Sequence, residues 1–143
     1  MINVRRAVKS DARKIAQAEK QYIDCPWTEK QISEEIDNPS VRFFVAEENG
    51  EFVGYLSGVV TCDECEVSNI AVSENFRRRG IGKMLFAALE DCLNRIGVRQ
   101  MFLLVRDGNS VAQGLYCKIG FNVVGKRKNY YQGQDALIMR KNL

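Results

Sequence analysis

The spacing of apolar residues changes along the chain from a two-residue to a three- and four-residue period, and these changes mark the expected elements. Residues 2–7 predict a short strand. Ser10 then stands where it can cap a helix whose apolar residues at positions 12, 15, 16, 22 and 23 roughly follow helical spacing. Pro26 breaks that pattern, so we expect the helix to end before it.

A second helix is expected to begin at Thr28. Thr28 and Gln31 have the spacing of a capping box, and Trp27 and Ile32 fit a hydrophobic staple across the same turn. This helix should end at Asn38-Pro39, because the residue before a proline avoids the helical conformation.

The rest of the chain alternates between expected strands and helices. Strands are expected over residues 41–47, 52–61, 64–72, 101–106, 123–131 and 136–140. Helices are expected over residues 81–96 and from Asn109 or Ser110 to Gly120. Asn49-Gly50 is typical of a tight hairpin turn, and Gly97 of a helix end. This order of elements predicts a mixed sheet with helices on its faces, an α/β or α+β fold.

Composition narrows the classes of protein. The chain has 143 residues, for which we expect one domain over residues 1–143. No apolar run approaches the roughly 20 residues that span a bilayer, and the N-terminus lacks an apolar signal segment, so a soluble cytoplasmic protein is expected. The absence of histidine excludes His-dependent triads and the commonest transition-metal ligand. Catalysis must therefore rely on carboxylates, tyrosines, backbone amides or a cofactor.

One peptide combines basic residues with glycines where the helix over residues 81–96 should begin. It reads Arg77-Arg78-Arg79-Gly80-Ile81-Gly82 and follows an expected strand. Glycine lets the backbone approach a ligand closely, and a helix N-terminus offers unpaired N–H groups and partial positive charge. Together these favour an anion site, most naturally for a pyrophosphate. The alternative is a solvated basic turn before a helix. The pattern is neither a dinucleotide fingerprint, which needs a third glycine, nor a Walker loop.

Two motifs resemble signatures of the GNAT acetyltransferase superfamily. They are Arg77-x-x-Gly80-x-Gly82 and Asn109-x-x-Ala112-x-x-Leu115-Tyr116-x-x-x-Gly120-Phe121. Further segments are similar to those of the bacterial ribosomal-protein-alanine N-acetyltransferases, namely Pro26-Trp27-Thr28, Asn69-Ile70-Ala71-Val72, Asn129-Tyr130-Tyr131 and Asp135-Ala136-Leu137-Ile138-Met139. The resemblance covers essentially the whole chain and implies a mixed sheet of about seven strands flanked by about four helices.

The resemblance also implies an enzyme that takes acetyl from acetyl-coenzyme A (acetyl-CoA), which would lie where two parallel strands separate. Tyr116 is then the general acid, with a core aromatic as its alternative role. A phenol suits that task because its usual pKa, about 10, is near the thiol's, about 8.5. Trp27, Tyr130 and Tyr131 are expected to contact the acceptor between the Pro26-Trp27 turn and the hairpin over residues 130–135. The implied acetyl-CoA contacts are Ile70, Ala71, Val72, Arg77, Arg78, Arg79, Gly80, Ile81, Gly82, Lys83 and Asn109.

One position departs from the subgroup, whose general base is a glutamate two residues before an arginine. Here the stretch reads Leu103-Leu104-Val105-Arg106, and Leu104 cannot accept a proton. Glu66, which shares a strand face with Glu64, is the candidate base acting through a water; alternatively both are solvated carboxylates. A base is also less needed for an α-amino group, of which about a tenth to a sixth is neutral at pH 7, than for a lysine.

We therefore expect acetyl transfer to a protein N-terminus, with a ribosomal protein as one candidate acceptor. The expected protein is a monomer or weak dimer that binds neither nucleic acid nor membrane. Acetylation of a small amine, or a CoA-binding regulatory module with weak catalysis, stays open as an alternative. Cys62-x-x-Cys65 lacks two further metal ligands, so no metal is expected. Lys126-Arg127-Lys128 is more typical of a solvated strand edge than of an RNA site.

Overall fold

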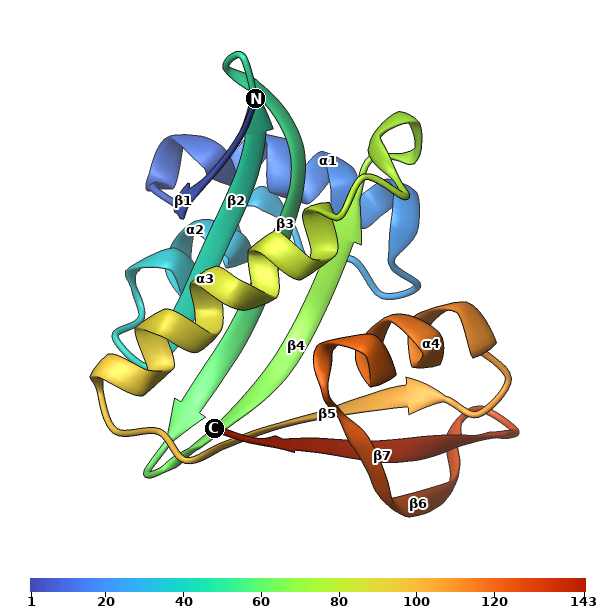
Figure 1. The fold of residues 1–143 in the computed structure, drawn as a ribbon. Helices are drawn as coiled ribbons and strands as arrows, with labels where there is room; N and C mark the ends of the chain where they lie inside the picture. The colour runs from blue at the N-terminus through green and yellow to red at the C-terminus, as the bar shows by residue number, and fades with distance from the viewer.

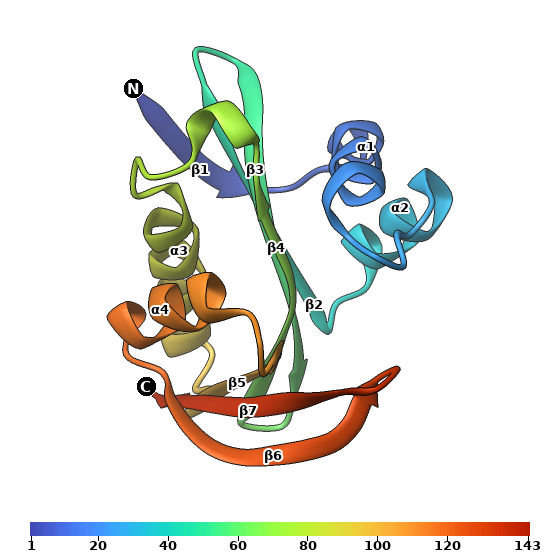
Figure 2. The same cartoon turned by 90° about the vertical axis from the view of Figure 1, so that its right-hand side faces the viewer.

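The fold, described for all 143 residues by a computed structural model, is a seven-stranded mixed sheet between two layers of helices (Figure 1). Its elements are β1 (Ile2–Arg6), α1 (Ala12–Tyr22), α2 (Glu29–Asp37), β2 (Val41–Glu48), β3 (Glu51–Thr61), β4 (Glu64–Val72), α3 (Ile81–Arg95), β5 (Gln100–Arg106), α4 (Ser110–Ile119), β6 (Asn122–Tyr131) and β7 (Gln134–Asn142). The strand order is β1-β2-β3-β4-β5-β7-β6. Figure 2 shows α1 and α2 on one face of the sheet and α3 and α4 on the other. The predicted fold class and element order are confirmed.

Local signals in the sequence explain several element ends. Thr28 and Gln31 form the predicted capping box, with their side chains accepting each other's backbone N–H groups at 3.2 and 2.9 Å. Asn49 and Gly50 both have positive φ angles, 51° and 82°, as a tight hairpin between β2 and β3 requires. Gly97, with φ of 80°, follows the end of α3 as predicted. No helix is both long and apolar enough to cross a bilayer.

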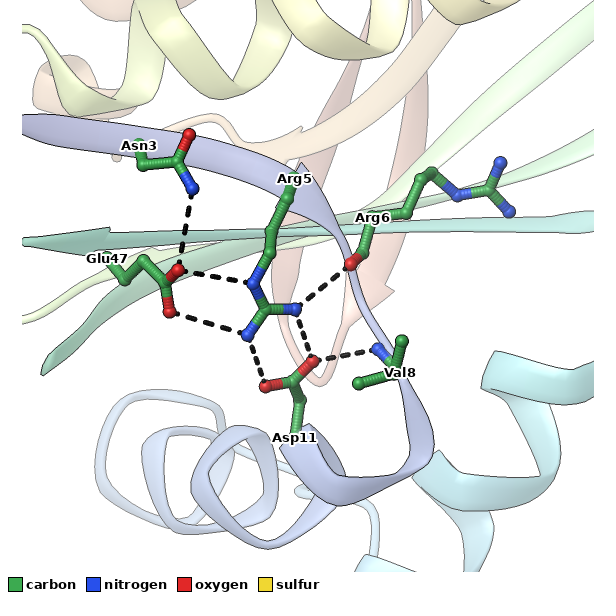
Figure 3. A network of polar contacts seen from close by, with 6 residues as sticks. All are labelled: Asn3, Arg5, Arg6, Val8, Asp11 and Glu47. Atoms are coloured by element: carbon green, nitrogen blue, oxygen red, sulfur yellow. Dashed lines mark hydrogen bonds and ion pairs between the residues drawn. The ribbon is translucent and has the colours of Figure 1, made fainter. Parts of the chain in front are cut away.

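The predicted cap at Ser10 is wrong. Ser10 lies inside a 3-10 turn over Lys9–Asp11, and the Asp11 carboxylate accepts the N–H of Val8 at 2.8 Å. The same carboxylate accepts two hydrogen bonds from the Arg5 guanidinium at 2.8 and 2.9 Å (Figure 3). These bonds lower the pKa of Asp11 and join β1 to the start of α1. An ion pair between β1 and the turn before α1, rather than a serine hydroxyl, therefore holds the start of α1.

Each face of the sheet carries its own core. Seventeen buried residues, among them Phe86 and Phe121, form the core under α3 and α4. Nine others, among them Ile15, Ile32 and Tyr55, form the core under α1 and α2. Full burial of such a side chain contributes about 1.5–3 kcal/mol, so both layers hold the sheet firmly.

A bulge at Ser68 changes the sheet face to which the following side chains of β4 point. The pairing register between β3 and β4 skips Ser68. Before the bulge, Val67 packs in the core under α3; after it, Ala71 packs in the core under α1. The side chain of Asn69 consequently points toward α1, where it donates to Glu19 at 3.2 Å.

β4 and β5 pair in parallel over only three residues and then separate. Their last paired residues are Glu66 and Phe102. Beyond that point β5 continues along β7, away from β4, as Figure 1 shows. Residues 70–72 therefore pair with β3 on one side and with no strand on the other. The expected separation of two parallel strands is confirmed.

Candidate active site

The loop between β4 and α3 has a backbone suited to an anion. Arg78 and Gly80 have positive φ angles of 63° and 77°, and α3 begins at Ile81 without a side-chain cap. The six consecutive backbone N–H groups from Arg78 to Lys83 donate to no backbone group of the chain. Free N–H groups at the positive end of a helix are the arrangement that binds phosphate groups.

The three arginines of this loop lie differently. The guanidinium of Arg77 lies 4.9 Å from the ring centre of Tyr22. Arg79 forms an ion pair with Glu48 of β2. Arg78 takes part in none of the ion pairs or ring contacts of the loop. Arg77 and Arg79 thus brace the loop within the chain, and the charge of Arg78 is the most available to a ligand.

Gly82 lies within ordinary contact distance of α4 and β4. A Cβ atom at this position would lie 3.4 Å from Leu115 of α4 and 3.8 Å from Ile70 of β4. Gly82 therefore faces the place where α3, α4 and β4 meet. The requirement at Gly80 is different, because a Cβ there would meet nothing within 4 Å and only the positive φ favours glycine.

Asn109 caps α4, as predicted. Its side-chain oxygen accepts the N–H of Ala112 at 3.1 Å. The capping role occupies the carbonyl oxygen of Asn109 and leaves its amide nitrogen as the group that can donate to a ligand.

Tyr116 lies on α4 within an aromatic cluster. Its ring meets the rings of Phe86 and Phe121 edge to face, at centroid distances of 6.0 Å in both pairs. Burial raises the pKa of Tyr116 to about 12, with a smaller contribution from Tyr131. The phenol is therefore protonated throughout the physiological pH range and can act as a hydrogen-bond donor.

Arg106 lies beside the expected acceptor groove, the space between the Pro26-Trp27 turn and the hairpin over residues 130–135. It donates to Gln134 of the hairpin at 2.9 Å and forms an ion pair with Asp24 beyond α1. Its guanidinium also lies 4.5 Å from the ring centre of Tyr131. The hydroxyl of Tyr131 in turn donates to the carbonyl of Leu104 at 3.5 Å. One side chain of β5 thus links the hairpin to the segment that leads into the Pro26-Trp27 turn.

Trp27 and Tyr130, the other residues expected at the acceptor, keep 42% and 48% of their surface exposed. The N–H of Trp27 donates to the Glu19 carboxylate at 2.9 Å. Tyr130 packs edge to face against Tyr131 at a centroid distance of 4.9 Å. Each rim of the acceptor groove therefore presents a half-exposed aromatic ring, which suits contact with a peptide.

Glu66 stands where β4 and β5 begin to separate. Its side chain is exposed and points to the face of β4 opposite the core under α3. Leu104 lies two residues beyond Phe102, the β5 partner of Glu66, so all three share one face of the sheet. Glu64 is engaged, since it accepts a hydrogen bond at 2.6 Å. Glu66 is thus the carboxylate of β4 without a partner in the chain.

Sequence reasoning missed Glu19 and Arg106. Glu19 is only 2% exposed. It follows Ile15 by four residues, so a carboxylate on the apolar stripe of the first helix was an available signal. Arg106 offered none, because its partners Asp24 and Gln134 are 82 and 28 residues away in the chain.

Comparison with known proteins identifies the same family as the two sequence motifs. Residues 8–121 match the Acetyltransferase (GNAT) family. The chain is 35% identical over 142 residues to the N-alpha-acetyltransferase RimI of Mycobacterium tuberculosis, covering 94% of this chain and 88% of that protein.

Two solved structures place the fold. The ribosomal-protein-S18-alanine N-acetyltransferase of Escherichia coli matches with a TM-score of 0.90 and 30% identity, covering 99% of this chain and 94% of that one. Arabidopsis thaliana NAA60, solved in complex with acetyl-CoA, matches in fold with a TM-score of 0.88 at 18% identity, covering 100% and 99%. The family match spans most of the chain and agrees with both signature motifs, so the chain belongs to the GNAT family of acetyltransferases.

Proposed function

We propose that this chain transfers acetyl from acetyl-CoA to the α-amino group at the N-terminus of a protein, with a ribosomal protein that begins with alanine as the candidate acceptor. The observation that carries the proposal is the separation of β4 from β5 beside the free N–H groups at the start of α3. The names of the E. coli and M. tuberculosis relatives supply the acceptor class.

The donor half of the site would be built from backbone groups. Ile70, Ala71 and Val72 have a strand edge without a partner, which can hydrogen-bond the amides of the pantetheine arm as an added strand would. The N–H groups from Arg78 to Lys83 would then take the pyrophosphate. Asn109 would donate to the pantetheine from the α4 side.

The transfer moves two protons. The acceptor nitrogen bonds to the thioester carbon and loses a proton to a base, the carbon–sulfur bond breaks, and the departing thiolate gains a proton. Tyr116 is the residue proposed to protonate the sulfur. Its pKa of about 12 lies further above the thiol's usual value, about 8.5, than the sequence alone suggested. We therefore assign Tyr116 to hydrogen-bond the sulfur first and to release its proton as negative charge develops there.

Glu66 is proposed to take the proton from the amine through a water. It is the unpartnered carboxylate where the strands separate, and it shares a sheet face with Leu104, the position to which the resemblance assigns a glutamate base. The site would favour amines that are often neutral already and so depend little on a base. An α-amino group, with a pKa near 8, is neutral far more often at pH 7 than a lysine side chain, with a pKa near 10.4.

Acetyl transfer to a peptide panel tests the proposal. The panel contains peptides with varied first residues, matched peptides with a blocked α-amine and an internal lysine, and polyamines and aminoglycosides. Mass spectrometry should place acetyl on free α-amines. Turnover of the small amines alone would favour a small-molecule enzyme. Binding of CoA without any turnover would favour a regulatory module.

A pair of substitutions tests the base. Glu66→Gln should lower turnover of a peptide α-amine near pH 7 by up to about tenfold if Glu66 is the base, because roughly a tenth of the amine is neutral there already. Glu64→Gln is the matched control, because Glu64 lies two residues away on the same strand face but accepts a hydrogen bond from Gln100. Equal turnover in both variants and the wild type would remove Glu66 from the mechanism.

A further inference from the structure

Glu19 is a buried carboxylate that the proposed chemistry does not use. It lies in α1 with 2% of its surface exposed, and it forms no ion pair with a lysine or arginine. A carboxylate in such a place is costly unless hydrogen bonds replace the water it has lost. Its partners therefore explain why it is there.

Three donors from separate parts of the chain meet at this carboxylate. The hydroxyl of Tyr55 on β3 and the side-chain amide of Asn69 on β4 donate to Oε2, at 2.9 and 3.2 Å. The backbone N–H of Trp27 donates to Oε1 at 2.9 Å. All three partners donate to the carboxylate in the structure, and the backbone N–H of Trp27 can only donate.

Two of these partners belong to opposite halves of the candidate site. Trp27 forms a rim of the acceptor groove, and its N–H precedes the cap of α2, so no helical bond holds it. Asn69 follows the bulge at Ser68 and directly precedes the free edge of β4 at residues 70–72. Glu19 is thus the single group that bonds both the acceptor rim and the strand proposed to hold the donor.

Glu19 also lines a small pocket of about 40 Å³ together with Trp27, Ser57, Ser68 and Asn69. Ser57, which is 4% exposed, also lines this pocket. A shift of Trp27 would change the shape of the pocket as well as the rim.

We propose that Glu19 is a positioning residue that fixes the Trp27 rim of the acceptor groove relative to β4. The inference rests on the proposed function, since it takes this groove as the acceptor site. The acceptor must approach an acetyl group held along β4, and a displacement of the rim weakens its binding without touching the donor's contacts.

Glu19→Gln should separate the two halves. With Tyr55 and Asn69 in their present orientations, the amide oxygen of glutamine accepts from both, and its NH₂ group then faces the N–H of Trp27, where two donors cannot bond. The Trp27 turn is released while the β4 side keeps its partner. Glu35→Gln is the matched control, because the Glu35 carboxylate lines the same pocket but bonds neither the turn nor β4.

The chain contains one tryptophan, so its fluorescence reports on this turn alone. In Glu19→Gln we expect the KM for an alanine-initiated peptide to rise roughly tenfold or more, as loss of a hydrogen bond to a charged group implies. The Kd for acetyl-CoA and the kcat should stay within about twofold. Acrylamide should quench Trp27 faster in Glu19→Gln than in the wild type and in Glu35→Gln.

The outcomes distinguish this inference from the proposed function. If the wild type acetylates no peptide α-amine, the proposed function fails. If a folded Glu19→Gln variant matches the wild type in peptide KM and in quenching, or loses donor and acceptor binding equally, the positioning role alone fails. If Glu19→Gln does not fold, hydrogen exchange on the wild type tests the inference instead. The Trp27 amide should exchange slowly there, and exchange at the rate of an unstructured peptide would overturn the inference.

Discussion

The donor half and the acceptor half of the candidate site are built from different materials. The donor half is mainly one continuous piece of backbone, from the free edge of β4 through the loop to the first turn of α3, with the side chain of Asn109 beside it. The acceptor half is assembled from side chains of α1, the turn after it, β5 and the β6–β7 hairpin. Backbone amides remain whichever side chains the residues carry, whereas a side-chain contact is lost when either of its two residues is substituted. Donor binding should therefore tolerate most substitutions outside the glycines, while acceptor binding should be sensitive to single polar changes.

The largest effect is expected where the two halves meet, at Tyr116. Tyr116→Phe should lower kcat by about 10²–10⁴-fold, because the departing sulfur loses its proton donor. Acetyl-CoA affinity should change little, since the ring and its contacts with Phe86 and Phe121 remain. Steady-state kinetics and calorimetry measure the two quantities.

A structural role for Tyr116 would give a different pattern, with a lowered thermal midpoint and normal turnover in the folded fraction. The pH profile adds a second check. Burial raises the pKa of Tyr116 to about 12, so the phenol keeps its proton below that pH. A loss of wild-type activity between pH 9 and 11 that vanishes in Tyr116→Phe would contradict this protonation state.

The donor half is tested next by Gly80→Glu. The new residue would have to adopt a φ of 77° and would place a negative charge at the start of α3. Backbone strain and repulsion of the pyrophosphate together should weaken acetyl-CoA binding roughly a hundredfold. Gly80→Asn is the control, because asparagine tolerates positive φ and carries no charge. Unchanged calorimetric affinity in a folded Gly80→Glu protein would place the phosphates elsewhere.

The contrast between the halves also explains what the sequence could reveal. The strand–loop–helix backbone between β4 and α3 was predictable because its requirements are local: glycines, a strand end and a helix start lie within a dozen residues. The capping box at Thr28 and the hairpin at Asn49-Gly50 were predictable for the same reason. The start of α1 was misplaced because Arg5, from another element, holds Asp11. The bulge at Ser68 likewise depends on pairing with β3 and has no signature of its own.

The acceptor half is tested by Arg106→Lys. Lysine keeps the charge but cannot bond Asp24 and Gln134 and stack on Tyr131 together, as the planar guanidinium does. The KM for a peptide acceptor should rise roughly tenfold, with acetyl-CoA affinity unchanged. Arg127→Lys is the control, because Arg127 contacts the Tyr130 ring but none of the three partners of Arg106. A rise in KM for acetyl-CoA instead would show that the halves are not separable at this position.

The smallest effect is expected at Leu104, and it concerns the amine. If the wild type relies on amines that are already neutral, its rate on a peptide α-amine should climb with pH up to the amine pKa near 8. Leu104→Glu would add a base on the face of the sheet shared with Glu66, and should raise the rate about threefold near pH 7. The gain has a ceiling of about tenfold, because roughly a tenth of the amine is neutral there already, and it should vanish above pH 8.5.

Burial can raise the pKa of the new carboxyl, so the whole pH profile, rather than one rate, is compared between Leu104→Glu and an isosteric Leu104→Gln. The proposed preference for N-terminal amines rests on Leu104 standing where a base is expected. Efficient wild-type acetylation of internal lysines near pH 7, with α-amines ignored, would contradict it.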